Sequence, residues 1–100
     1  MRAKQPSRDQ LTLSEILNAL SDPVRIEIVQ SIAGVGEQPC NQCGIDMPKS
    51  SLSHHFKVLR EAGVIATRVE GTRLINSVRS ADLNARFPGL LNAILKAARQ

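Results

Sequence analysis

Apolar residues recur at helical spacing along most of the chain. Between residues 13 and 20, leucine and isoleucine fall three, four and seven positions apart, which is typical of one buried helix face. Residues 24–32 repeat this pattern after Asp22 and Pro23. Aspartate suits the cap of a new helix, and proline suits its first position. The first third of the sequence therefore predicts two consecutive helices.

A longer helix is expected from Ser50 or Ser51 to Ala62, because apolar residues share one face there and Gly63 follows. The period then changes from 3.6 to 2. Residues 64–69 and 73–78 alternate around a tight turn at residues 70–72, which predicts a β-hairpin. A helical turn over residues 82–87 and a final amphipathic helix after Pro88-Gly89 complete the pattern.

The segment between the second and the long helix is the least regular part of the sequence. Pro39, Gly44 and Pro48 leave room only for a short helix within residues 39–45. The expected order is therefore α-α-α-α-β-β-α, a mainly α fold with a small β-hairpin. A short helix, a turn and a longer helix form a helix-turn-helix, and a basic hairpin directly after it is a wing. We predict a winged helix-turn-helix.

Length and composition narrow the class of protein. A chain of 100 residues fits one domain, expected here over residues 11–100, and polar residues 1–10 are expected to form a flexible tail. No apolar run approaches 18 residues and no signal peptide begins the chain, so we expect no membrane partner and a reducing, cytoplasmic location. Only two aromatic residues are present, which argues against base-stacking RNA modules.

Positive charge is concentrated in two places. Residues 49–79 contain six lysines or arginines and two glutamates, and residues 1–8 contain three cations and no carboxylate. The whole chain carries a net charge of only +4, so the rest of it is net negative. Concentrated positive charge is what phosphate binding and counterion release require. The alternative is a solvated basic surface without a partner.

Three stretches resemble regulators of the ArsR (ArsR/SmtB-like) family. Residues 19–25 (ALSDPVR) resemble its second-helix entry, residues 50–65 (SSLSHHFKVLREAGVI) its recognition helix and wing entry, and residues 70–73 (EGTR) its wing tip. The resemblance covers roughly residues 13–79. It implies a homodimer that binds a palindromic double-stranded DNA operator and usually represses until a metal or another signal releases it. The family's third helix is usually regular, whereas two prolines interrupt that region here.

The candidate DNA contacts lie on the expected recognition helix and wing. Serine, histidine and lysine at the start of a helix can donate to base edges or phosphates, and arginine on a wing can enter a narrow minor groove. One of the two serines at the helix start is expected to be its cap. His55 is expected to face inward and to be hydrogen-bonded. The candidates are Lys49, Ser50, Ser51, Ser53, His54, Lys57, Arg68 and Arg73.

Cys40 and Cys43 are the candidate sensing residues, and three interpretations remain open. They could be inert buried thiols, a redox-active pair, or ligands for zinc or another thiophilic metal. A Cys-x-x-Cys pair supplies only two of the four ligands that zinc prefers, so the metal interpretation needs further donors. No cofactor is assigned with certainty.

The first and last helices carry apolar faces that the resemblance assigns to a two-fold dimer interface. A symmetric dimer would match a palindromic site. Packing within one protomer is the alternative. The candidate interface residues are Leu13, Ile16, Leu17, Leu90, Leu91, Ile94 and Leu95.

Two other classes of function compete with DNA binding. An enzyme is disfavoured because the sequence lacks a Gly-rich phosphate loop, an HExxH motif and a βαβ pattern around the cysteines. A winged-helix module that binds only proteins would be expected to carry a neutral or acidic recognition helix and wing, whereas this stretch is basic. A DNA-binding transcriptional regulator, most simply a repressor, is the preferred prediction.

Overall fold

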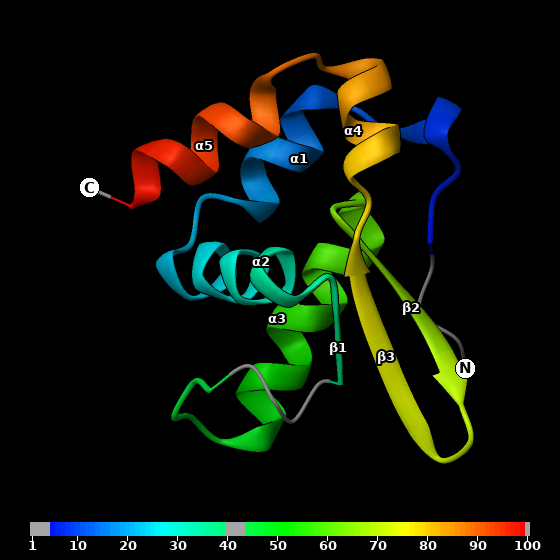
Figure 1. Cartoon of the computed structure of the whole chain (residues 1–100), viewed down its shortest axis with the longest axis vertical. Coiled ribbons are helices and arrows are strands. Elements are labelled where there is room, and N and C mark those ends of the chain that lie inside the picture. Colours follow the sequence, from blue (N-terminus) through cyan, green and yellow to red (C-terminus); the bar gives the residue numbers. More distant parts are fainter. Residues whose placement is uncertain (1–4, 40–43, 100) are drawn as a thin grey trace.

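The computed structural model describes residues 5–39 and 44–99. Figure 1 shows the turn of the β2–β3 hairpin at one end of the molecule and α1, α4 and α5 at the opposite end. The described elements are the 3-10 helix η1 (Arg8–Gln10), α1 (Leu13–Ala19), α2 (Pro23–Val35), β1 (Glu37–Pro39), α3 (Lys49–Ala62), β2 (Ile65–Glu70), β3 (Arg73–Val78), α4 (Ser80–Arg86) and α5 (Leu90–Ala98).

Local capping chemistry sets the helix boundaries. The Asp22 carboxylate accepts hydrogen bonds from the backbone N–H groups of Val24 and Arg25, and Pro23 occupies the first turn of α2, as the sequence predicts. At the C-terminus of α3, Gly63 ends the helix with φ of 90°. A non-glycine residue seldom adopts this left-handed conformation. Gly63 therefore lets the backbone turn from α3 into β2, which begins two residues later at Ile65.

A single apolar core joins the helices and the base of the hairpin. Ile28, Val29 and Ile32 of α2 are fully buried, as is Leu59 of α3. Ile65, at the start of β2, belongs to the same cluster. Because one core holds α2, α3 and the strand, the orientation of α3 relative to the hairpin is fixed by packing. Among the described residues, no helix has the length and hydropathy that crossing a bilayer requires.

The hairpin belongs to a three-stranded antiparallel sheet in the order β1-β3-β2. The two strands of the hairpin were expected, and both are confirmed with boundaries within one residue. Strand β1 was not expected, because three residues that end in proline give no alternating pattern. Pro39 is tolerated opposite Ile75 because β1 is an edge strand. The sheet therefore ties the segment before α3 to the wing.

The described residues of the irregular segment contain none of the short helix expected within residues 39–45. Residue 39 ends β1, and the described residues 44–48 contain no helix. Residues 40–43 lie outside the described ranges. Nearer the C-terminus, the turn expected over residues 82–87 is the two-turn helix α4, which begins at Ser80. The winged helix-turn-helix architecture is confirmed.

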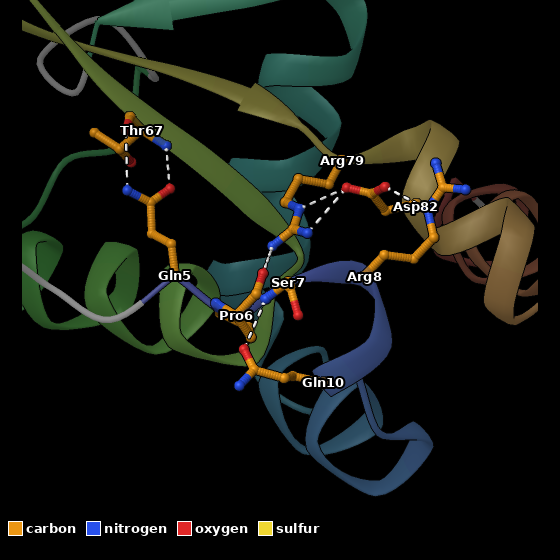
Figure 2. Close-up of polar contacts among 8 residues, drawn as sticks. All are labelled: Gln5, Pro6, Ser7, Arg8, Gln10, Thr67, Arg79 and Asp82. Atoms are coloured by element: carbon orange, nitrogen blue, oxygen red, sulfur yellow. Dashed lines mark hydrogen bonds and ion pairs between the residues drawn. The ribbon is translucent and has the colours of Figure 1, made fainter.

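Residues 5–10 are part of the folded domain and not the flexible tail that their polarity suggested. The Gln5 side chain is hydrogen-bonded to the backbone of Thr67 in β2, and Pro6 is buried (Figure 2). Arg8 forms an ion pair with Asp82 of α4 at 2.7 Å. Residues 1–4 lie outside the described ranges. Short-range sequence patterns could not predict this docking, because its partners are more than 60 residues away.

Asp82 forms ion pairs with Arg8 and Arg79, so part of the free energy of unfolding depends on pH. Hydrogen bonds from Arg8 and Arg79 hold the pKa of Asp82 below its ordinary value of 3.8. A pKa lowered by folding means that the stabilisation is present above the unfolded pKa and is lost as the pH falls through the folded one. In denaturant titrations, we expect Asp82→Asn to cost about 1–2 kcal/mol at pH 7. The cost should become progressively smaller as the pH falls below the ordinary pKa of 3.8. A cost that does not change with pH would contradict this assignment.

Candidate nucleic-acid interface

Helix α3 presents one polar face and buries the other. Phe56, Leu59 and Ala62 face the core, and α3 therefore holds its opposite face toward solvent. The side chains of the predicted contact residues on α3 are exposed except for Ser51, which is half-buried. These residues are Lys49, Ser50, Ser51, Ser53, His54 and Lys57.

The N-terminus of α3 differs in one detail from the sequence prediction. Its N-cap position is Pro48, and within the described part of the chain no side-chain hydrogen bond caps this position, so neither Ser50 nor Ser51 is the cap. Both hydroxyls are therefore available for contacts elsewhere. The backbone N–H groups of an uncapped first turn, together with the helix dipole, favour a phosphate. Lys49 stands at the first helical position beside them.

A hydrogen-bonded cluster fixes α3 against α2. Arg25, whose side chain is only 13% exposed, lies with Nη1 at 3.1 Å from Nδ1 of His55. Arginine has no acceptor, so Nδ1 of His55 is the acceptor in this contact. Arg25 also donates from Nε to the backbone oxygen of Ala19 at 2.6 Å. The inward, hydrogen-bonded position expected for His55 is confirmed.

The two wing arginines have different surroundings. Arg68 donates to both carboxylate oxygens of Glu37 at 2.6 and 2.9 Å, and to Glu70 at 3.0 Å. These hydrogen bonds from Arg68 hold the pKa of Glu37 below its ordinary value. Arg73 is exposed, and within residues 5–39 and 44–99 its side chain has no hydrogen-bond or ion-pair partner. The charge of Arg68 is thus compensated, whereas that of Arg73 is available.

Arg79 is also committed within the fold, although it contributes to the positive charge of residues 49–79. Its side chain is 11% exposed, pairs with Asp82 at 2.9 Å and donates to the backbone oxygen of Pro6. Sequence reasoning missed these pairs, because partners so distant along the chain leave no periodic signal. Fewer cations of residues 49–79 can therefore contact a phosphate than the net charge of this stretch suggests.

This difference gives a testable contrast between the two wing arginines. We expect Arg73→Ala to reduce the slope of log K against log salt for DNA binding by about one unit per protomer, because one phosphate contact is lost. Arg68→Ala removes a cation that already has two carboxylate partners, and its effect on the slope should be smaller. Fluorescence anisotropy titrations at several salt concentrations measure both. Equal reductions would contradict the inferred difference.

The predicted dimer residues separate into two groups. The first group, Ile16, Leu91 and Leu95, is buried within one protomer. These side chains lie beneath the candidate dimer surface and are not exposed on it. Leu13 and Leu17 of α1 are 48% and 44% exposed. Leu90 and Ile94 of α5 are half-buried. The exposed apolar surface is therefore smaller than the sequence pattern indicated.

Cys40 and Cys43 lie outside the described residues, so the structure does not place them. The described residues nearest to them in the sequence are Pro39, the last residue of β1, and Gly44. The choice among inert, redox-active and metal-binding thiols stays open. Within the described ranges, no three His, Cys, Asp or Glu side chains are grouped as a metal site would require.

Comparisons with known proteins agree with this geometry. The family model of the bacterial regulatory proteins of the arsR family matches residues 22–67, which run from the N-cap of α2 into β2. The uncharacterised HTH-type transcriptional regulator YceK of Bacillus subtilis (strain 168) is 35% identical over 97 residues, covering 94% of this chain and 95% of YceK. The transcriptional repressor SdpR of the same organism is 28% identical, covering 84% of this chain and 94% of SdpR.

Solved structures show the same fold. The crystal structure of an ArsR family transcriptional regulator has a TM-score of 0.66 at 20% identity, covering 97% of this chain and 99% of that one. The crystal structure of a possible transcriptional regulator for arsenical resistance has a TM-score of 0.62 at 25% identity, covering 86% of this chain and 97% of that one. Taken with the family match and the similarity to YceK, these observations show that the chain belongs to the ArsR family of bacterial regulatory proteins.

Proposed function

We propose that this protein is a homodimeric transcriptional repressor that binds a palindromic operator in the cytoplasm and is released by a small signal. Each protomer would insert the first half of α3 into a major groove and place the wing, β2–β3, on the flanking backbone or minor groove. The first turn of α3 and the turn of the wing lie at the same end of the molecule (Figure 1). The proposal rests on this shared end and on the charges available there and on α3, those of Lys49, Lys57 and Arg73.

Phosphate contacts would supply most of the affinity, and a few base contacts would supply the sequence preference. Lysine and arginine are suited to the first role. The hydroxyls of Ser50 and Ser53 and the imidazole of His54 are suited to the second, because they are exposed near the start of α3.

The dimer proposal rests on the exposed part of α1 and the half-buried part of α5. Pairing two copies through Leu13, Leu17, Leu90 and Ile94 would remove apolar surface from water, which favours association. A two-fold axis between the copies would present two α3 helices to successive major grooves. The name of SdpR, a repressor, supports repression as the sign of regulation.

The signal is proposed to act on Cys40 and Cys43, through a redox change or a thiophilic metal. β1 ends directly before Cys40 and pairs with β3 of the wing. A bond formed at the thiols would therefore pull on a strand that the wing shares. We expect Cys40→Ser to leave the affinity of the reduced, metal-free protein for DNA unchanged and to abolish its response to oxidant or Zn²⁺. Equal responses of wild type and variant would rule out both forms of sensing.

The proposed function is tested by anisotropy with a labelled duplex taken from the DNA directly upstream of the protein's own gene. Reduced, metal-free protein should bind this duplex with steep salt dependence and should bind a shuffled duplex of the same composition at least tenfold more weakly. Absence of binding to either duplex at low salt would reject DNA binding. A winged-helix module that binds only proteins would then be the remaining function.

A further inference from the structure

One face of the three-stranded sheet carries four side chains whose charges cancel. Side chains alternate along a strand, and paired residues of antiparallel strands share a face. Arg68 and Glu70 of β2 therefore lie on the same face as Arg73, which pairs with Glu70. Glu37 of β1 pairs with Ser77, four residues from Arg73 along β3, and so belongs to this face as well. Two arginines and two glutamates leave the four with no net charge.

Glu37 occupies the guanidinium of Arg68 as a phosphate would. Nη1 and Nη2 of Arg68 donate to the two carboxylate oxygens of Glu37, at 2.6 and 2.9 Å. Two parallel hydrogen bonds from one guanidinium are the geometry in which arginine binds carboxylates and phosphates alike. Glu70 accepts from Nη2 at 3.0 Å. Glu37 is therefore the partner that engages both terminal nitrogens of Arg68.

The register of the wing places Arg68 where it would meet the same DNA backbone as Arg73. Arg68 lies two residue pairs from the pair that contains Arg73, on the same face of the hairpin. Two residues along a strand span roughly 7 Å. A wing that turns Arg73 toward DNA therefore turns Arg68 the same way, and only the carboxylates stand between Arg68 and a phosphate.

The contact between Arg68 and Glu37 is open to competition. Their side chains are 48% and 54% exposed. Ion pairs between exposed side chains contribute little to stability, because water screens them and ordering two long side chains costs entropy. A DNA backbone offers many phosphates, and each contact releases counterions. Glu37 and DNA therefore compete for one guanidinium.

We propose that Glu37 is an autoinhibitory residue, which holds Arg68 in the geometry of a phosphate complex and thereby lowers the affinity of the wing for DNA. This inference rests on the proposed function, because it assumes that the wing lies on DNA. Glu37 belongs to the three-residue edge strand β1, whose place beside β3 holds the carboxylate next to the wing (Figure 1). Without this carboxylate, DNA gains a second wing arginine in addition to Arg73.

The first experiment removes the charge of Glu37 and keeps its size. Glu37→Gln and the wild type are titrated by fluorescence anisotropy on the labelled upstream duplex between about 50 and 200 mM salt. At the lower salt concentration, we expect the variant to bind about three- to tenfold more tightly, with a slope of log K against log salt steeper by about one unit per protomer. Unchanged affinity and slope would overturn the proposal.

Glu27→Gln is the matched control, because it changes the net charge by the same amount. Glu27 is an exposed glutamate of α2 that lines a groove with Ala98 of α5, and Figure 1 shows the C-terminal end of α5 away from the wing turn. Its replacement should leave affinity and slope unchanged. If both variants tighten binding equally, the effect comes from net charge, and the autoinhibitory role of Glu37 is wrong.

The second experiment asks whether Glu37 acts through Arg68. Arg68→Ala is measured alone and together with Glu37→Gln, which completes a double-mutant cycle. With Glu37 present, Arg68→Ala should change the slope by well under about one unit, whereas with glutamine at position 37 it should lower the slope by about one unit per protomer. Equal effects in both backgrounds would mean that the two side chains act independently, which contradicts the proposal. Thermal unfolding midpoints should stay close to that of the wild type, since the pair is exposed.

The outcomes separate this inference from the proposed function. If the wild type binds neither the upstream nor the shuffled duplex, the proposed function fails, and this inference fails with it. If the wild type binds and Glu37→Gln binds identically, only the autoinhibitory contact fails. Because phosphates carry no sequence information, the gain in affinity should be the same on both duplexes. A gain confined to the upstream duplex would mean that Arg68 reads base edges, and the proposed competition between Glu37 and phosphate would be wrong.

Discussion

Gly63→Ala is expected to destabilise the protein by about 2–5 kcal/mol, because two costs add at this position. The backbone φ is 90°, a conformation that costs an L-residue about 1–2 kcal/mol. A β-carbon would also lie 2.1 Å from Cδ2 of Leu11 and 3.2 Å from Cγ of Pro6. Leu11 is buried and cannot move aside freely, and overpacking of this kind costs about 1–3 kcal/mol more.

The matched control is Gly34→Ala in α2. Gly34 lies inside the helix, and an added β-carbon there would meet nothing within 4 Å. Alanine should therefore stabilise the protein by up to about 1 kcal/mol through its helix propensity. Urea titrations of the three proteins, followed by far-UV circular dichroism, measure the difference. If Gly63→Ala unfolds within about 0.5 kcal/mol of the wild type, the tight junction between α3 and the wing is wrong.

The double variant Lys49→Ala/Lys57→Ala is expected to weaken DNA binding at least a hundredfold. A dimer would lose four phosphate contacts, each worth about 0.9 in the slope of log K against log salt, so the slope should fall by about three to four units. Both side chains are exposed on α3, so the fold should keep its stability. Affinity is measured by anisotropy on the upstream duplex.

Lys96→Ala provides the control for this variant. Lys96 is an exposed lysine of α5, near the C-terminal end that Figure 1 shows away from the wing turn. Its removal lowers the net charge but should leave the slope unchanged, because only cations near the phosphates release counterions. Should Lys96→Ala change the slope as much per charge as the double variant does, binding would depend on overall charge and not on α3.

The parts of the fold that follow from short-range chemistry could be predicted. Asp22 and Pro23 begin α2 because the carboxylate caps the free N–H groups and proline fits the first turn. Gly63 ends α3 because few other residues adopt its backbone conformation. The period-2 alternation on both sides of Gly71 predicted the hairpin that forms the wing. Each of these signals lies within a few residues of the structure it predicts.

The parts that depend on distant partners could not be predicted. β1 forms because β3 offers a free edge to residues 37–39, and nothing in those three residues alternates. Gln5 docks because Thr67 has an exposed backbone edge 62 residues away. For the candidate site, the exposed residues of α3 followed from helix periodicity. The hydrogen bonds from Arg68 to Glu37 did not follow from any such pattern. Because of them, Arg73 and not Arg68 is the wing arginine whose charge is available for a phosphate.

In the proposed function, two α3 helices read successive major grooves of one operator. Dimethyl sulfate interference on the upstream DNA tests it directly, because methylation at guanine N7 adds a group in the major groove. We expect two clusters of interfering guanines, about 10 base pairs apart and related by a two-fold axis. Binding that is indifferent to methylation of every guanine in a G-containing site would contradict it.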